Sequence, residues 1–548
     1  MSNASNSNAQ PQAARSLLRR FLFPIIVFVV ITCIAAAGPV MEAMELDTEA
    51  AIPVLMVLQP GVILGVLALG IWWLFFSGFS WLTRFAALGL LAVGIGAFAL
   101  SLTQVELTST PTGLRPIFHF VWETTDQDRY AEYQAQHPVG VNDVVVAVVG
   151  PNDFPGYRGP NRDGVLPDAK LQTDWTTHSP KQVWQRPCFD GYSGIAVAGN
   201  LVVTLEQRGK QEGVVCYDRT TGSERWVFAY DAFHRDIMGN GPRSTPTIHD
   251  GRIFTLGATG EFLCLDVEGK KKWGVNILED SKAKNIKWGM TGSPLIFKDL
   301  VIAHAGVDPE NPAGAALVAF EQKTGKKAWA IGNRRAGYSS PQLATLAGVT
   351  QILLFDGDGL VGYDPDSRQE LWSFPWKTDF DMNSIQPVVL SDGRVFISSE
   401  LANGCAMLRI AHKKNSQPAW SVDVVWKNKN LAARFANPVS DGKRIFGLHG
   451  LAGQLRCLDA ISGDVVWRGE RCGPGQMLLA GDTLLVVHEK GVVTLLDKDS
   501  ASDTELARQQ MLGTGQKKWK TWNTPALAGD QLFVRNQSEI ACWKLPQR

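Results

Sequence analysis

The chain has 548 residues, of which 45% are hydrophobic, and its 53 basic residues are balanced by 53 acidic ones. This length exceeds one ordinary domain, and the apolar content is enough to build a large core. A formal net charge of zero provides no basic surface of the kind that nucleic acids bind, so the sequence predicts no nucleic-acid partner.

The N-terminal fifth of the chain is predicted to be a membrane anchor. Residues 1–20 are rich in Asn, Ser, Gln and Ala, which predicts a disordered, cytoplasmic N-terminus. Three uncharged stretches follow, at about 21–37, 52–76 and 85–102. Apolar segments of this kind cross bilayers as helices, so residues 21–102 are predicted to form three transmembrane α-helices.

The arginines predict the orientation of this anchor. Arg15, Arg19, Arg20 and Arg84 flank one side of the three stretches, whereas residues 42–49 carry only acidic charges. Because basic residues prefer the cytoplasmic side, the N-terminus is expected there. Three crossings then place everything after Leu102 in the periplasm or outside. The expected location is the inner or cytoplasmic membrane, as a multi-pass protein.

Residues 103–150 form a predicted linker of mixed composition. Within it, residues 126–136 are predicted to form a short polar helix and residues 143–149 a strand.

A repeated unit organises the rest of the sequence. In residues 215–226, VCYDRTTGSERW, an apolar strand enters Asp218, Gly222 reverses the chain, and a second strand ends on Trp226. Copies occur at residues 263–273, 318–329, 361–372 and 456–467, with weaker ones at 407–420 and 494–506. Spacings of about 40–50 residues are typical of propeller blades. The recurring tryptophans, Trp184, Trp226, Trp273, Trp329, Trp372 and Trp467, are therefore predicted to dock one blade on the next.

A second hairpin precedes most copies, so each period supplies four strands, which is one blade. Blades are predicted to start near Ser193, Ser244, Gly292, Ser339, Ile385, Ala436, Gln476 and Asn523. The fold class is thus an all-β, eight-bladed β-propeller over residues 151–548, preceded by the three membrane helices. The last blade lacks a fourth strand, and Gln182, Val183 and Trp184 are predicted to supply it and close the ring.

A family resemblance accompanies this pattern. The segments FPGYRGPNRDGV (residues 154–165), PKQVWQRP (180–187), GPRSTPTIHDGRIFTLGATGEFLCLD (241–266) and GYSSPQLATLAGVTQILLF (337–355) resemble membrane-anchored PQQ-like (pyrrolo-quinoline quinone repeat) β-propeller proteins. The resemblance covers roughly residues 151–545. The chain also resembles outer-membrane assembly proteins of the BamB type and, distantly, quinoprotein alcohol dehydrogenases.

The dehydrogenase resemblance implies PQQ as a cofactor, and no specific motif in this chain supports it. The sequence lacks the adjacent cysteine pair that covers the quinone in those enzymes, and it lacks a CxxCH haem motif. No catalytic residue and no metal ligand set is assigned. His234, His304 and His449 have no metal-ligand spacing and are predicted to lie on the surface or in loops.

One group of residues is a candidate binding site. Loops that enter the innermost strands of a propeller line the axial funnel, and three residues before each aligned Pro the chain has Tyr192, Arg243, Thr291, Tyr338, Ser384, Phe435, Pro474 and Trp522. The candidate rim is Tyr192, Arg243, Trp288, Tyr338, Arg434, Phe435 and Trp522. Aromatic rings and a guanidinium suit a sugar ring, a quinone or a peptide side chain. The alternative is that these aromatics only fill the rim between blades.

Two functions follow from these patterns. The first is a membrane-anchored extracytoplasmic PQQ-like propeller that acts as a binding or scaffold module for a protein or glycan partner. The alternative is a PQQ-dependent quinoprotein oxidoreductase acting on alcohols or sugars.

Overall fold

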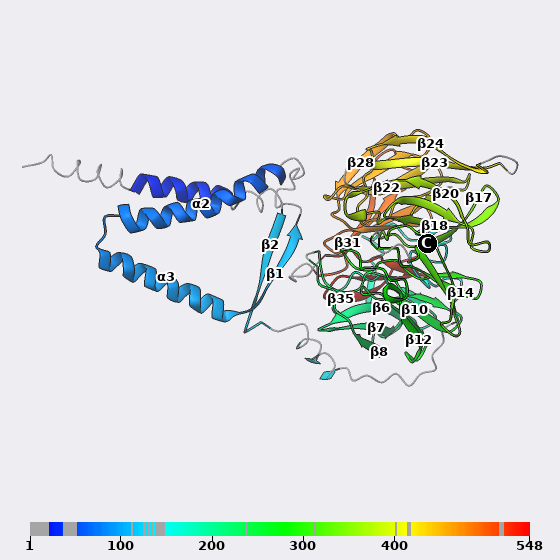
Figure 1. The fold of residues 1–548 in the computed structure, drawn as a ribbon, viewed down its shortest axis with the longest axis horizontal. Coiled ribbons are helices and arrows are strands. Elements are labelled where there is room, and N and C mark those ends of the chain that lie inside the picture. The colour runs from blue at the N-terminus through cyan, green and yellow to red at the C-terminus, as the bar shows by residue number, and fades with distance from the viewer. Residues whose placement is uncertain are drawn as a thin grey trace, which may run out of the picture. The chain divides into compact units, whose positions relative to one another are not determined.

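A computed structural model provides the structure of the chain. It describes residues 21–34, 36, 52–110, 113–123, 128, 131–132, 135–136, 148–236, 238–308, 310, 314–400, 403–413, 418–513 and 520–548. The chain divides into two compact units, Met1–Thr124 and Thr125–Arg548. The helices belong mainly to the first unit and the propeller to the second (Figure 1).

The first unit contains apolar helices and one hairpin. Phe21–Ile34 is helical, and α2 (Ile52–Phe76) and α3 (Trp81–Ser101) follow. Strands β1 (Leu102–Thr110) and β2 (Gly113–Phe120) then pair antiparallel, within the stretch predicted to be a mixed linker. The predicted helix at 126–136 lies mostly outside the described residues, as does the predicted strand at 143–149 except for its last two residues.

The prediction of three membrane helices has to be corrected. Among the described helices only α3 is long and apolar enough to cross a membrane, whereas Phe21–Ile34 and Pro60–Phe76 are shorter apolar helices. Spanning the hydrocarbon core takes about 20 residues, and α2 contains Pro60, whose missing N–H interrupts helical hydrogen bonding.

Helix α3 also begins four residues before the predicted boundary. Ser80 caps it, because its side chain accepts a hydrogen bond from the Thr83 N–H at 3.2 Å. Arg84, which was expected in a loop, therefore lies in the helix, where its guanidinium donates to the Leu74 carbonyl oxygen.

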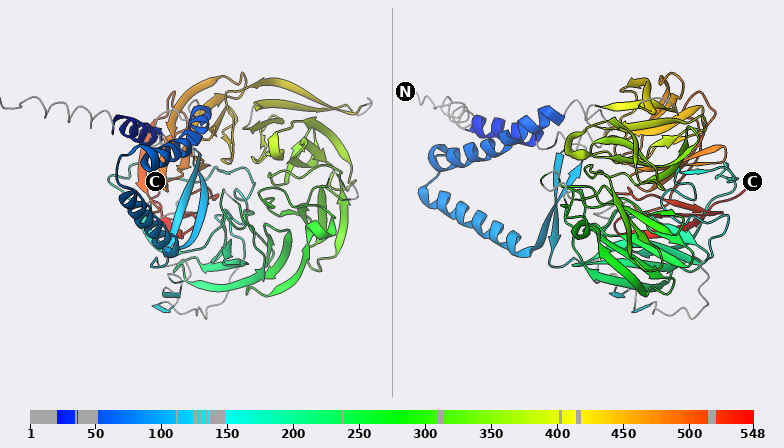
Figure 2. Two further views of the ribbon diagram at one scale, coloured as in Figure 1. Left: turned by 60° about the vertical axis from the view of Figure 1, so that its left-hand side comes forward. Right: turned by 45° about the vertical axis from the view of Figure 1, so that its right-hand side comes forward.

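The second unit is an eight-bladed propeller, as predicted, with its blades arranged around a central axis (Figure 2). The first four sheets consist of β5 (Ala196–Ala198), β6 (Leu201–Arg208), β7 (Gln211–Asp218) and β8 (Glu224–Asp231); β9 (Thr247–His249), β10 (Arg252–Leu256), β11 (Glu261–Asp266) and β12 (Lys271–Asn276); β13 (Leu295–Phe297), β14 (Leu300–His304), β15 (Leu317–Glu321) and β16 (Lys327–Ile331); and β17 (Gln342–Leu346), β18 (Val349–Asp356), β19 (Gly359–Tyr363) and β20 (Glu370–Pro375). A short helix, α5 (Ile277–Asp280), follows β12, and a 3₁₀ turn, η1 (Asp379–Asp381), follows β20.

The remaining blades follow the same plan. They consist of β21 (Val388–Val389), β22 (Arg394–Ser399), β23 (Gly404–His412) and β24 (Trp420–Asn428); β25 (Val439–Ser440), β26 (Arg444–His449), β27 (Gln454–Asp459) and β28 (Val465–Arg471); β29 (Gln476–Ala480), β30 (Thr483–Val487), β31 (Val492–Asp497) and β32 (Glu505–Gln510); and β33 (Ala526–Ala528), β34 (Gln531–Arg535) and β35 (Glu539–Lys544). Strands within a blade pair antiparallel, and their inner residues form the buried core.

Residues from the start of the propeller complete its last two blades. Strand β4 (Lys181–Pro187) pairs antiparallel with β35, so that Trp184 lies opposite Cys542. This confirms the predicted ring closure. A shorter strand, β3 (Val165–Leu166), pairs parallel with β29 and makes the seventh sheet five-stranded, which the sequence pattern did not predict.

Three of the six recurring tryptophans bond to the next blade, as predicted, whereas Trp372 donates from Nε1 to Gln351 of its own blade at 2.7 Å. Trp184, Trp226 and Trp273 each donate from Nε1, at 2.9 Å, to a carbonyl oxygen in the β-turn of the next blade. Each indole also lies against the glycine of that turn, because a Cβ added there would come within 2.6 Å of the ring. The acceptor carbonyls belong to Arg219, Val267 and Gln322, and the glycines are Gly222, Gly269 and Gly325.

The fifth blade corrects one element of the predicted repeat. The sequence copy at residues 407–420 ends on Trp420, but Trp426 lies opposite Met407 and packs on Gly463 of the next blade. Trp420 instead lies opposite His412, with the two rings stacked 4.3 Å apart. The β23–β24 hairpin is longer than the others, which moves the docking tryptophan further along the chain.

Candidate functional site: the axial mouth

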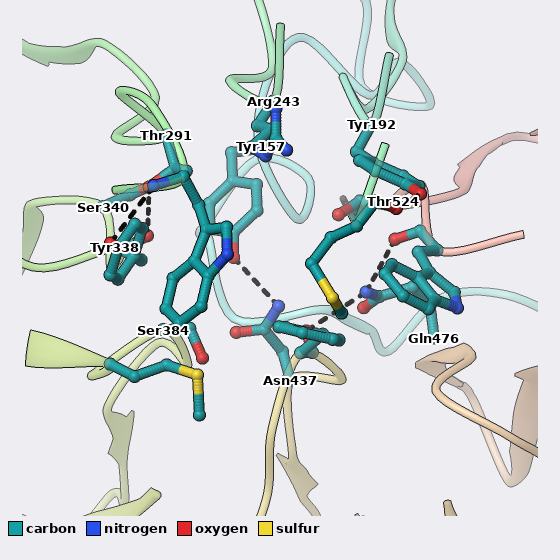
Figure 3. Close-up of a pocket in the computed structure, with 15 residues that line it drawn as sticks. Tyr157, Tyr192, Arg243, Thr291, Tyr338, Ser340, Ser384, Asn437, Gln476 and Thr524 are labelled. Atoms are coloured by element: carbon teal, nitrogen blue, oxygen red, sulfur yellow. Dashed lines mark hydrogen bonds between the residues drawn. The ribbon is translucent and has the colours of Figure 1, made fainter. Parts of the chain in front are cut away.

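A hollow of about 810 Å³, part of it open to solvent, lies where the loops before the innermost strands meet at the propeller axis (Figure 3). This hollow is called the axial mouth below. It is lined by Tyr157, Tyr192, Met238, Arg243, Trp288, Thr291, Tyr338, Ser340, Met382, Ser384, Phe435, Asn437, Gln476, Trp522 and Thr524.

Six of the seven predicted rim residues line the axial mouth. These are Tyr192, Arg243, Trp288, Tyr338, Phe435 and Trp522. The seventh, Arg434, forms an ion pair with Glu400 at 3.0 Å, and its guanidinium lies 5.0 Å from the Phe435 ring centre. The structure thus brings these residues together, and whether they bind a ligand stays a prediction.

The aromatic side chains of the mouth form two clusters. In the first, Trp522 stacks on Tyr192 with ring centres 5.1 Å apart and lies 5.0 Å from Phe435. In the second, Trp288 lies 5.3 Å from Tyr338. Burial raises the pKa of Tyr338 to about 12 and also raises that of Tyr192, so both hydroxyls stay neutral at physiological pH.

Arg243 is the one charged residue among the described residues that line the mouth. Its guanidinium donates to the carbonyl oxygens of Gly241 at 2.6 Å and Gly239 at 2.8 Å, and it lies 5.5 Å from the Tyr192 ring centre. Burial lowers its pKa from the ordinary arginine value. None of the described carboxylates lies within ion-pair distance of it. Asp236 and Glu212 act on it electrostatically from beyond that distance. A guanidinium without a direct ion pair in an aromatic hollow can attract an anion.

Residues 154–166 cross the inner side of the mouth and form its floor. The Tyr157 hydroxyl accepts a hydrogen bond from Asn437 Nδ2 at 2.9 Å (Figure 3). Arg158 donates to the Pro438 carbonyl oxygen in the sixth blade at 2.7 Å. Arg162 donates to the carbonyl oxygens of Pro294 and Ser293 in the third blade. This segment, called the plug below, therefore ties opposite parts of the ring together.

Hydrogen bonds also join each blade to the next around the axis. Ser193 Oγ donates to the Ser244 carbonyl oxygen, and the Thr245 and Ser293 N–H groups donate to Ser293 Oγ and Ser340 Oγ. Glutamine and asparagine side chains continue the series. The side-chain amides of Gln342, Gln476 and Asn523 donate to backbone carbonyl oxygens, and Asn437 Oδ1 accepts from the Gln386 N–H. These bonds fix the positions of the lining loops.

Sequence reasoning missed the floor of the mouth. Tyr157 lies in a segment that the sequence singled out for its family resemblance, but no local pattern assigned it to the axis. Asn437 and Gln476 lie at or next to predicted blade starts. An amide side chain at such a buried position could have identified them as lining residues. Met238 and Met382 lie in longer loops, and the spacing of the repeats does not predict their positions.

None of the described carboxylates lines the axial mouth. Two carboxylates act electrostatically on Arg243, Asp236 more strongly than Glu212. Glu212 accepts hydrogen bonds from the Tyr230 hydroxyl at 2.7 Å and the Ala258 N–H at 3.1 Å. Burial raises the pKa of Glu212 to about 7. Its oxygens are thus already used by groups of the first and second blades.

One cluster of possible metal ligands lies elsewhere in the propeller. Glu470, Cys472 and His488 have ligand atoms within 4.8 Å of one another and could hold a metal ion, but Arg508 already pairs with Glu470 at 2.6 Å.

His304 corrects a prediction, because it is the buried last residue of β14 and not a surface residue. Burial lowers its pKa to about 4.

The fold and the mouth define a β-propeller of the PQQ-like repeat class. The profile of the family described as "Outer membrane protein assembly factor BamB" matches residues 210–422 and 409–542, which is more than half of the chain. The chain therefore belongs to this family. No curated protein sequence matches it significantly.

Solved structures show a similar architecture at low identity. The quinohemoprotein alcohol dehydrogenase of Comamonas testosteroni is 11% identical over 72% of this chain and 82% of its own, with a TM-score of 0.48. One from Pseudomonas putida is 12% identical over 74% and 83%, with a TM-score of 0.49. BamB of Moraxella catarrhalis is 13% identical over 65% and 84%, with a TM-score of 0.32. No functional conclusion follows from likeness at this level.

Proposed function

We propose that this protein is a membrane-anchored, extracytoplasmic binding module that takes a group of a protein or glycan partner into the axial mouth of its propeller. One observation carries the proposal. The mouth combines aromatic side chains from six loops with Arg243, the one cation among its described lining residues, which forms no ion pair with a described carboxylate. Aromatic surfaces and an available guanidinium are a means of recognition, and they supply no acid–base chemistry.

The proposed anchor is α3. It is the described helix that meets the length and hydropathy of a membrane span. Basic residues at Arg15, Arg19, Arg20 and Arg84 favour the cytoplasm for the N-terminal side of this helix. A single crossing from there places the propeller outside the cytoplasm, which is also the result that three crossings would give.

The alternative is a PQQ-dependent quinoprotein oxidoreductase, and one observation favours it. A planar quinone that carries carboxylates would suit the aromatic rings and Arg243. Such an enzyme also needs a carboxylate base and oxygen ligands for Ca²⁺. The lining supplies neither, because its oxygen donors are hydroxyls and amides. The residues present therefore do not fit the catalytic arrangement, and no reaction step is assigned.

Site-specific photo-crosslinking of the full chain in its membrane tests the proposal. A photo-reactive amino acid at Phe435 or Thr524 would lie in the mouth, whereas one at Val466, an exposed residue of β28, would lie outside it. We expect a covalent adduct from the two mouth positions, absent from Val466 and lost when Arg243→Ala is added. Equal adducts at all three positions, or none at the mouth, would contradict the proposal.

A second assay addresses the alternative. The full chain is supplied with PQQ and Ca²⁺, and dye-linked oxidation of alcohols and sugars is measured. Oxidation activity that disappears in the Arg243→Ala variant would show that the protein is the oxidoreductase, and it would contradict the proposed role as a binding module.

A further inference from the structure

The turn η1, at the outer edge of the axial mouth, has an unfavourable backbone conformation. Phe380 has φ 58° and ψ 23°, and the next residue, Asp381, has φ 55°. A bulky side chain rarely adopts this left-handed region, and two such residues in succession are rarer still. Strained backbone of this kind tends to occur at ligand-binding sites.

The surrounding structure holds this turn in place from both sides. The Asp381 carboxylate pairs with Arg335 at 2.7 Å. Immediately after the turn, Asn383 donates from Nδ2 to the carbonyl oxygens of Asp356 at 2.7 Å and Trp376 at 2.9 Å. Three independent contacts therefore fix a conformation that the local sequence disfavours.

The result of this strain is an exposed aromatic ring. Phe380 is 59% exposed, although Met382 two residues later is buried in the lining of the mouth. The Phe380 ring meets Trp288 edge to face, with centres 5.9 Å apart. Lys287 Nζ lies 3.8 Å from the Phe380 ring centre and 5.1 Å from that of Trp288. Lys287, Trp288 and Phe380 are called the clip below.

The clip lies beside a second hollow that adjoins the axial mouth. This hollow, of about 750 Å³ including its open part, is lined by Lys287 and Phe380 and shares Tyr338 with the mouth. Its other cations are already paired, since Lys284 contacts Asp308 at 3.2 Å and Arg335 contacts Asp381. Lys287 has no described carboxylate within ion-pair distance. Two cations without a direct ion pair thus lie against the two aromatic clusters, Lys287 against Trp288 and Phe380, and Arg243 against Tyr192.

The polar side chains of the mouth argue against a ligand rich in hydroxyl groups. Thr291 and Ser384 donate to the carbonyl oxygens of Tyr338 and Arg434, and Gln476 donates to those of Phe435 and Trp522. Asn437 uses both its amide nitrogen and its oxygen within the ring. These four side chains therefore have little hydrogen-bonding capacity left for sugar hydroxyls, whereas the ring surfaces and the two cations are available.

We propose that the clip is a second subsite and that the ligand is an acidic peptide segment, with an aromatic side chain in the axial mouth and carboxylates toward Arg243 and Lys287. This inference rests on the proposed binding function and names the class of partner. The strained turn presents Phe380 before the ligand arrives, so ordering it costs no further entropy on binding.

Peptide binding to the full chain in detergent or nanodiscs tests this inference. The probe is a fluorescent peptide that alternates aspartate and phenylalanine, compared with versions in which asparagine replaces aspartate or alanine replaces phenylalanine. We expect the acidic aromatic probe to bind, and both altered probes to bind about tenfold more weakly. We expect Lys287→Ala and Phe380→Gly each to weaken binding by about tenfold as well.

Matched variants separate binding from folding. Glycine tolerates positive φ, so Phe380→Gly should leave thermal stability equal or higher while binding falls. Arg368→Gly makes the same change at φ 65° in the β19–β20 turn and should leave binding unchanged. Lys326→Ala removes an exposed lysine from an outer turn and should also have no effect.

Each remaining outcome has a defined meaning. If Arg243→Ala weakens probe binding and the two clip variants do not, the clip is not a subsite and the axial mouth alone is the binding site. No probe binding at about 1 mM would overturn the peptide assignment, and binding of an oligogalacturonate instead would replace it with an anionic glycan. Probe binding that is also unchanged by Arg243→Ala would contradict the proposed function itself.

Discussion

Trp184, from the first long strand of the propeller, lies against Gly222 of the first blade while it completes the last blade. Its Nε1 donates to the Arg219 carbonyl oxygen at 2.9 Å, and a Cβ added to Gly222 would lie 2.4 Å from the indole. One side chain therefore joins the last blade to the first. The same contact recurs at Trp226 and Trp273, so ring closure uses the interaction that joins other neighbouring blades.

Gly222→Ala should lower the free energy of unfolding by more than its conformational penalty alone. Gly222 has φ 69°, which costs an alanine about 1 kcal/mol, and the clash with Trp184 should add about 1–3 kcal/mol. Gly251→Ala is the matched control, because Gly251 has φ 68° and no atom within 4 Å of its added Cβ. Urea unfolding of both variants measures the difference, and equal losses would show that the tryptophan contact contributes nothing.

Arg162→Ala should destabilise the propeller by about 2–4 kcal/mol. The substitution removes hydrogen bonds to Pro294 at 2.9 Å and Ser293 at 3.0 Å and leaves both carbonyl oxygens without this partner. Arg409→Ala, at an exposed position of β23, should change stability by less than about 0.5 kcal/mol. Thermal unfolding followed by circular dichroism compares the two, and a neutral Arg162→Ala would mean that the plug does not brace the ring.

Glu212 should make the protein less stable as the pH rises. Its pKa is raised from 4.5 to about 7 by burial, so between these values the folded state holds a proton that the unfolded state has lost. The contribution is therefore favourable at low pH and is lost as the pH rises through about 7, by about 3 kcal/mol in total.

Glu212→Gln should remove this dependence. The buried histidines titrate equally in both proteins, so the difference between variant and parent isolates Glu212. We expect the stability advantage of the variant to grow between pH 5 and pH 7, measured by urea unfolding at each pH. A difference that stays constant with pH would show that Glu212 is ionised throughout this range.

Leu91→Arg should weaken membrane attachment if α3 is the anchor. Leu91 is an exposed apolar residue near the middle of the helix, and an arginine there costs about 2.5–3.5 kcal/mol in membrane insertion. Alkaline extraction of membranes should release more of this variant than of Val424→Arg, which places the charge on an exposed propeller strand. Full retention of Leu91→Arg would assign the anchoring to other segments.

The sequence predicted those parts of the structure that repeat. Asp218, Gly222 and Trp226 recur as a set, because the same turn and the same blade contact are needed in successive blades. This repetition was enough to predict eight blades and the strand that closes them. It was also enough to bring six rim residues to one axis, since each occupies an equivalent place before an inner strand.

The parts that do not repeat could not be predicted. Arg158 and Arg162 bind backbone carbonyls of residues 280 and about 130 positions away, and a carbonyl carries no sequence signal. Phe380 adopts its strained conformation because distant residues hold it, against its own preference. Trp426 was missed because an extended hairpin changed the spacing on which the repeat was recognised.

Because β3 pairs with β29 and β4 pairs with β35, these early strands are synthesised long before the strands with which they pair. Residues 165–187 leave the ribosome more than 280 residues before the strands that will cover them. Throughout that interval they are uncovered strand edges, which other chains can join. Removing β35 alone would leave β4 permanently without its partner.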